Sequence, residues 1–142
     1  MKHLFATSKL RAELESRLAP PLEGPNLIRV AIETISDAMF QAPMSCRIIL
    51  YSVLEGDSRA IRAIWGDLEP IYALLAGHIN NGIRRRRLRR VDSVAAARLI
   101  VAAAIHHYQV YELYRGKKRS GFGTKDLSRP YADIIHHGLK AG

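Results

Sequence analysis

Residues 93–114, SVAAARLIVAAAIHHYQVYELY, form a helical pattern with very little polar surface. At about 100° per residue, Arg98, Gln109 and Glu112 fall within one narrow arc, and nearly every other position is apolar or aromatic. A helix of this kind is expected to be buried on two sides. The core of a 142-residue chain needs only one of them. The other side predicts contact with a second copy, and a central helix in a monomeric bundle is the alternative.

The rest of the chain also shows helical periodicity, and no stretch alternates as a strand does. Hydrophobic residues make up 48% and charged residues 25%, which is typical of a globular protein. We therefore expect an all-α fold of about six helices in a single domain, 1–142. The predicted helices are 8–18, 26–41, 44–54, a long fourth helix that carries 61–83, then 93–114 and 124–140.

Short polar residues mark where two of these helices begin. Asp57 or Ser58 is expected to cap the fourth helix, and Asp92 or Ser93 the fifth, because their side chains can accept hydrogen bonds from free N–H groups at a helix start. Pro70 lies inside the fourth helix. Since proline removes one backbone hydrogen bond, we expect a kink just before it.

The fifth helix and the last helix are expected to form the dimer contact together. The small alanines of the fifth helix allow another helix to approach closely, and the last helix has an apolar face. Two copies of this pair would make a symmetric four-helix interface. The residues expected there are Ala96, Ile100, Ala103, Val110, Leu127, Ile134, Ile135 and Gly138.

Two segments resemble a known family. LRRVDSVAAARLI (88–100) is similar to the segment that precedes and opens an alanine-rich helix in tetracycline-repressor (TetR) type transcriptional regulators. YADIIHHGLKAG (131–142) resembles the last helix of that family, which often closes on a Gly-Leu pair. The helix order is also similar. The resemblance implies the C-terminal domain of such a regulator, which binds a small effector and dimerises.

The start of the chain departs from the family pattern. Members carry a helix-turn-helix before the ligand domain, whereas MKHLFATSKLRAEL resembles only the end of that unit, with Phe5, Thr7 and Lys9 as its candidates. Residues 1–10 are therefore expected to be a remnant of a DNA-binding domain. On this reading DNA is a partner only through a helix-turn-helix that this sequence does not contain.

The resemblance also places a ligand cavity between the middle helices. The residues expected to line it are Met39, Tyr51, Trp65, Tyr72, His107 and Tyr111. The apolar and aromatic character of this set favours a hydrophobic effector. Large residues on helical stripes are more often core residues, and the alternative for His107 is a core histidine whose ring is satisfied by a carbonyl or a tyrosine.

Six arginines crowd the turn between the fourth and fifth helices, in a chain of net charge +9: Arg84, Arg85, Arg86, Arg87, Arg89 and Arg90. Cations near a helix C-terminus are stabilising, so the cluster is compatible with a solvated corner. The alternative is a phosphate-contacting patch without sequence specificity. In that case the protein would be a stand-alone helical adaptor that binds nucleic acid or another anion.

Enzymatic function is not indicated. Cys46 has no evident base beside it, and His78, His136 and His137 lack the spacing of a metal-ligand set. No glycine-rich phosphate loop is present, so we expect no catalytic residue, cofactor or metal. A single cysteine, the lack of an apolar leader and the lack of a membrane-length apolar run favour a cytoplasmic location without membrane contact.

Overall fold

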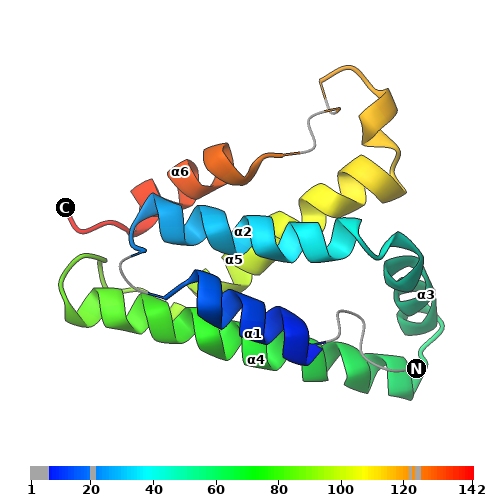
Figure 1. Cartoon of the computed structure of the whole chain (residues 1–142), viewed down its shortest axis with the longest axis horizontal. Helices are drawn as coiled ribbons and strands as arrows, with labels where there is room; N and C mark the ends of the chain where they lie inside the picture. Colours follow the sequence, from blue (N-terminus) through cyan, green and yellow to red (C-terminus); the bar gives the residue numbers. More distant parts are fainter. Residues whose placement is uncertain (1–6, 20–21, 122, 124–125) are drawn as a thin grey trace.

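The computed structural model describes residues 7–19, 22–121, 123 and 126–142, and within them the fold is all-α, as the sequence predicts (Figure 1). None of the described helices is long and apolar enough to cross a membrane. The helices are α1 (Thr7–Arg17), α2 (Pro25–Phe40), α3 (Pro43–Leu54), α4 (Ser58–Arg84), α5 (Ser93–Tyr108) and α6 (Ser128–Leu139), with a π-helical turn at Gln109–Leu113 and a 3-10 turn at Gly116–Lys118. Residues 1–10 were expected to be a remnant of a DNA-binding domain. Of these, residues 1–6, which include Phe5, lie outside the described residues.

Helix α2 occupies the middle of the bundle. It packs against α1 on one side, α5 on another and α6 on a third, while α4 packs against α5 and α1 (Figure 1). The reason is its sequence: Ile28, Ala31, Ile32 and Ile35 are all at most 4% exposed, and Val30 on a neighbouring face is also buried. A helix that is apolar over most of its circumference must be covered on most sides.

The small residues of the alanine-rich helix α5 pack against other helices of the same subunit. Ala97 and Ala104 are fully buried, which allows α5 to lie close to both α2 and α4. Ala96 and Ile100 were expected to face a second copy, and this expectation is wrong. They are 6% and 0% exposed in the core of a single subunit, because the same close approach brings α2 and α4 over them.

The opposite side of α5 remains uncovered. Val94 is 50% and Leu99 54% exposed, and Ala95, Arg98 and Ala102 are also exposed. Of the predicted polar arc, Arg98 is exposed where the helical wheel places it, whereas Gln109 and Glu112 are half-buried. Both of the latter belong to the π-helical turn that follows α5. The free face of α5 is thus largely apolar.

The predicted helix starts are confirmed. The Asp57 carboxylate accepts a hydrogen bond from the backbone N–H of Arg59 at 2.9 Å. The Asp92 carboxylate accepts from the N–H groups of Val94 and Ala95, both at 3.0 Å. Each carboxylate therefore satisfies donors that have no partner within the helix. Helix α4 continues through Pro70 as a single helix.

Helix α6 begins four residues later than the sequence predicts. Leu127 precedes the helix instead of lying on its apolar face, and it is half-buried. The Asp126 carboxylate accepts a hydrogen bond from the N–H of Ser128 at 2.9 Å, which favours a helix start at this point. Pro130, in the first turn, has no N–H group that needs a partner there. The expectation that Leu127 contributes to a dimer contact from the apolar face of this helix is therefore not supported.

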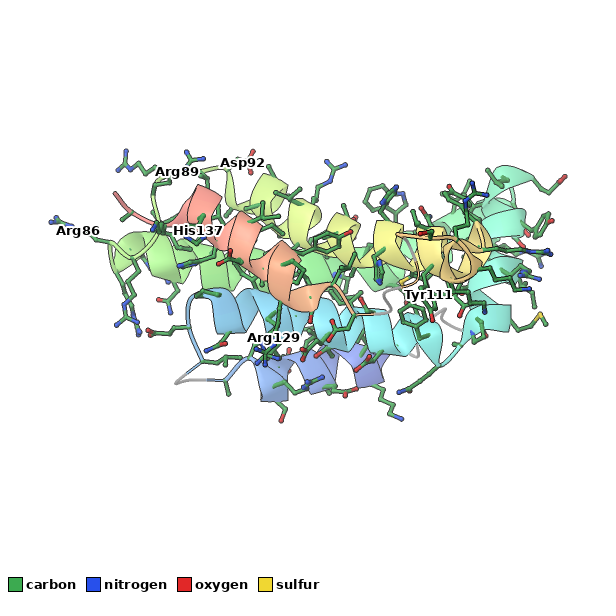
Figure 2. The ribbon with its side chains drawn as sticks, turned by 90° about the horizontal axis from the view of Figure 1, so that it is seen from above. Arg86, Arg89, Asp92, Tyr111, Arg129 and His137 are labelled. Carbon is green, nitrogen blue, oxygen red and sulfur yellow. The ribbon has the colours of Figure 1, made fainter. Side chains whose placement is uncertain are left out.

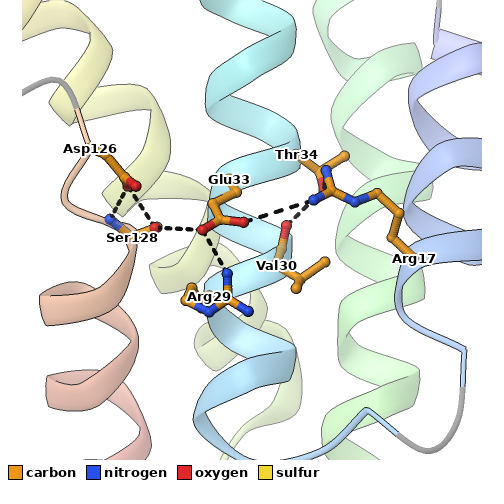
Figure 3. A network of polar contacts seen from close by, with 7 residues as sticks. All are labelled: Arg17, Arg29, Val30, Glu33, Thr34, Asp126 and Ser128. Carbon is orange, nitrogen blue, oxygen red and sulfur yellow. Dashed lines mark hydrogen bonds and ion pairs between the residues drawn. The ribbon is translucent and has the colours of Figure 1, made fainter.

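Glu33 on α2 connects three helices through polar contacts (Figure 3). Its carboxylate lies 2.7 Å from Nη1 of Arg29 on the same helix and 3.8 Å from Nη2 of Arg17 at the end of α1. The hydroxyl of Ser128 at the start of α6 lies 3.1 Å from the same carboxylate. Arg17 also donates to the Thr34 hydroxyl at 2.6 Å. This network holds the end of α1 and the start of α6 against α2.

Replacement of Glu33 by alanine should destabilise the fold by about 1–2 kcal/mol, because it leaves two partly buried guanidinium groups without their carboxylate. Thermal or urea unfolding followed by circular dichroism measures this loss. Glu15→Ala is the matched control, since Glu15 pairs with Arg11 at an exposed site and its loss should cost less than about 0.5 kcal/mol. Equal destabilisation by the two variants would contradict the role of the network.

Candidate functional site

The arginine segment 84–90 closes one end of the bundle as a tight turn. Arg86 has a left-handed backbone with φ of 59°, and the N–H groups of Arg87 and Leu88 both reach the Gly82 carbonyl, at 2.9 and 3.2 Å. A side chain at Gly82 would collide with Leu88, since an added Cβ would lie 2.7 Å from Cδ1 of that leucine. The missing side chain at Gly82 therefore allows Leu88 to fold back onto the end of α4.

The same turn is bonded to the C-terminal residues. The backbone N–H of Arg89 donates to the Leu139 carbonyl at 2.8 Å, and the N–H of Ala141 donates to the Arg87 carbonyl at 3.1 Å. The Arg89 side chain also donates, from Nε to the Gly138 carbonyl at 2.6 Å. Figure 2 shows Arg89 beside the end of α6 and Arg86 extending away from the bundle. Arg89 thus satisfies carbonyls at a helix C-terminus, as expected for a charged corner.

Glu23 provides a counter-charge for two of the arginines. It forms ion pairs with Arg87 and with Arg85, the latter at 3.9 Å between Nη1 and Oε1. All three side chains are at least half exposed, at 50% to 59%, so these ion pairs are only weakly stabilising and are screened by salt. Such pairs are easily exchanged for another anion.

A cavity of about 660 Å³ opens beside these ion pairs. Its size lies within the range of roughly 300–1,000 Å³ that is usual for small-molecule sites. Exposed residues form its rim: Glu23, Arg85, Arg86 and Arg87. Its floor reaches the buried core of the bundle and is apolar: Leu18, Ile28, Leu75, Ile79, Ile100 and Leu139. We call this space the end cavity.

Two histidines add polar groups to the wall of the end cavity. Burial lowers the pKa of His78 below its ordinary value, and burial, followed by the nearby His137 and Lys140, does the same for His136. Nδ1 of His136 is buried and has no hydrogen-bond partner within the described part of the chain. The His136 ring also lies against Gly24, where an added Cβ would be 3.6 Å from Cε1.

A second cavity of about 110 Å³ lies between α3, α4 and α5. Met39, Ile64 and Leu68 line it together with Ile105 and Tyr108, so it is almost entirely apolar. An engineered cavity of about 150 Å³ is known to hold a benzene molecule. A site smaller than that offers little room for an effector unless the surrounding helices move.

Cys46 and Tyr108 lie in the wall of this second cavity. The Cys46 thiol points to the Met39 carbonyl, with 3.8 Å between Sγ and O, and burial raises the pKa of Cys46. Burial also raises the pKa of Tyr108 to about 12. Both groups are therefore protonated at neutral pH, so the cysteine has no thiolate character.

The predicted ligand-binding residues do not gather around one cavity. Met39 lines the second cavity. Trp65 and Tyr51 lie at the surface, at 50% and 65% exposure, because they are on the outer sides of α4 and α3. Tyr72 is half-buried and packs against the main core. Their assignment as one ligand-lining set is therefore not supported by their positions.

His107 and Tyr111 belong to an aromatic cluster instead. The His107 ring is 5% exposed and lies 6.3 Å from Phe40, 6.1 Å from Tyr111 and 6.2 Å from Tyr131 between ring centroids. Phe40 also makes edge contacts with Tyr108 and Tyr111. This arrangement favours the interpretation of His107 as a core histidine.

The arginines are visible in the sequence as a charge cluster, but the end cavity beside them is not. The cavity depends on the position of α6, whose last residues form one wall. No comparison of this chain with known families or with curated proteins gives a match. Among the described residues, no three His, Cys, Asp or Glu side chains are grouped so that they could hold a metal ion.

The two cavity histidines predict a pH-dependent stability. Because burial holds the folded-state pKa of His78 and His136 below the ordinary value of 6.5, the unfolded chain binds more protons in acid. Their contribution is complete above about pH 6.5 and is lost as the pH falls toward the folded pKa. The melting temperature should therefore fall from pH 7.5 to pH 5.5.

The variant His78→Gln/His136→Gln should show a smaller drop over the same interval, measured by circular dichroism. His106→Gln is the control, since His106 is exposed on α5 away from the end cavity. A pH dependence that is identical in the wild type and the double variant would contradict the assignment. The lowered pKa of Asp57 and Asp126 acts only at more acidic pH, since their ordinary value is 3.8.

Proposed function

We propose that this chain is the effector-binding and dimerisation domain of a TetR-type transcriptional regulator. The observation that carries the proposal is the apolar surface of its last two helices. Leu99 on α5 and Ile134 on α6 are 54% and 69% exposed, and Val94 is 50% exposed. An isolated bundle gains nothing from large apolar side chains in water, whereas a second copy would bury them.

The arrangement of α5 and α6 suits a symmetric contact. Both helices pack against α2, and they also contact each other over a smaller area (Figures 1 and 2). Ala95, Ala102 and Gly138 are exposed on the same two helices, and they leave room for a partner helix. Of the other residues expected at the interface, Ala103, Val110 and Ile135 are half-buried and keep some surface for contact.

An effector in the end cavity would be coupled to this contact. Ile100 of α5 and Leu139 of α6 both line the cavity, so both dimerising helices form part of its wall. A ligand that fits one arrangement of the two helices better than another would favour that arrangement in the dimer. In such regulators the dimer sets the spacing of two DNA-reading heads on successive major grooves, roughly 34 Å apart.

A helical adaptor that binds nucleic acid is the second candidate. It is supported by the exposure of Arg84, Arg86 and Arg90 at one end of the bundle. Against it stand the ion pairs with Glu23 and the structural use of Arg89 at the end of α6, which reduce the charge that is free for phosphates. We therefore place it below the regulator domain.

The purified chain should be a dimer at micromolar concentration, and the variant Leu99→Glu/Ile134→Glu should be a monomer. Each glutamate would place a charge in the desolvated centre of the contact, which costs several kcal/mol when it has no partner. Light scattering after size-exclusion chromatography measures the mass directly.

Leu54→Glu is the matched control. Leu54 is also an exposed leucine, at 74%, but it lies at the end of α3, so its replacement should leave the dimer mass unchanged. Circular dichroism should show the same helical content for all variants. A wild-type chain that is monomeric, or a dimer that survives the double glutamate variant, would refute the proposed contact.

Gel shift with random-sequence DNA separates the two candidates. The regulator domain alone should bind weakly at about 0.15 M salt, with little difference between the wild type and Arg84→Ser/Arg86→Ser. Tight binding that weakens steeply with salt and is lost in this variant would favour the adaptor instead.

A further inference from the structure

We propose that the end cavity binds an anionic amphiphile, a single apolar chain that ends in a carboxylate or a phosphate. The inference deepens the proposed function, on which it rests only in calling the ligand an effector. Binding itself requires neither a dimer nor a DNA-reading head. The two ends of the cavity differ in chemistry, since the floor is apolar and the rim is cationic.

The floor of the cavity requires an apolar ligand. Leu22, Leu27 and Leu88 line the cavity and are half-buried, so they offer apolar surface to a ligand. They pack against the buried core, which includes Ile79 and Ile100. A polar group placed against these leucines would lose hydration without gaining a partner, whereas a hydrocarbon chain suits them.

The rim of the cavity requires a negative charge. Arg85 and Arg87 supply two guanidinium groups that share the single carboxylate of Glu23, and Arg86 adds a third positive charge that extends away from the bundle (Figure 2). Guanidinium groups bind carboxylates and phosphates with the same planar pattern of donors. Glu23 therefore marks the position that a ligand head would share or take over, and the arginines keep a net positive charge even with Glu23 present.

His136 adds a half-buried imidazole to the wall of the cavity. Its Nδ1 is covered by the protein, so a ligand would contact the open edge of the ring and not that atom. The apolar floor and the cationic rim together match a fatty acid or an alkyl phosphate.

Isothermal titration calorimetry with four probes tests the ligand class. Laurate and dodecyl phosphate carry both features, dodecanol has the chain without the charge, and inorganic phosphate has the charge without the chain. We expect laurate or dodecyl phosphate to bind at least tenfold more tightly than the other two. Whichever of the two binds more tightly identifies the head group, carboxylate or phosphate.

Chain length and charge variants locate the site. From octanoate to laurate, the affinity should rise roughly twofold to fourfold per added methylene. Arg85→Ser/Arg87→Ser should weaken laurate binding tenfold or more, whereas Glu23→Gln should strengthen it severalfold because it removes the competing carboxylate. Arg47→Ser/Arg62→Ser is the control: it removes the same charge from exposed sites on α3 and the first turns of α4, and should change nothing.

Several results would overturn the inference. Equal affinity for laurate and dodecanol would show that the rim does not recognise charge, and equal affinity for inorganic phosphate would show that the floor is not used. Laurate binding that is unaffected by Arg85→Ser/Arg87→Ser would place the ligand elsewhere. If none of the four probes binds but random-sequence DNA does, the arginines bind a polyanion and the cavity does not bind an amphiphile. A chain that binds laurate as a monomer would support this inference and refute the proposed dimer, so the two can fail independently.

Discussion

The close approach of α5 to α2 and α4 is the contact on which the rest of the structure depends. It is possible because Ala97 and Ala104 present only methyl groups to the neighbouring helices, and both are fully buried. With α5 this close, α2 can be covered by α5 on one side and by α6 on another. A larger side chain at either alanine would separate the helices, and overpacking of this kind typically costs about 1–3 kcal/mol. The same approach turns the other side of α5, with Leu99, toward solvent.

The arginine end of the bundle shows how one segment serves both stability and the candidate site. Arg89 binds the last carbonyls of α6, and the backbone of the turn pairs with the residues that follow this helix. This attachment places Leu139 over the space that α2, α4 and α5 leave open, and so creates the end cavity. The neighbouring arginines repel one another, and the carboxylate of Glu23 offsets part of that repulsion. A ligand head group would offset more of it.

Much of the secondary structure could be predicted because its causes are local. The capping carboxylates of Asp57 and Asp92 and the prolines that open α2 and α3 act on residues within one turn. The start of α6 was misplaced although its causes are also local, since the Asp126 carboxylate accepts from the N–H of Ser128 and Pro130 follows in the first turn. For the candidate site, the arginines were visible as a charge cluster. The cavity beside them was not, since segments that lie far apart in the sequence form its walls.

The sequence by itself determined the all-α class, the helix order and the position of the positive charge, because periodicity, capping and composition are properties of the chain. It also determined that α5 would have more apolar surface than polar surface. Only the tertiary structure decided which of those apolar residues are used internally: Ala96 and Ile100 went to the core, while Leu99 and Val94 remained outside. The physical reason is that a helical wheel gives the angles between side chains but not the directions from which other helices arrive, and those directions are set by packing among distant segments.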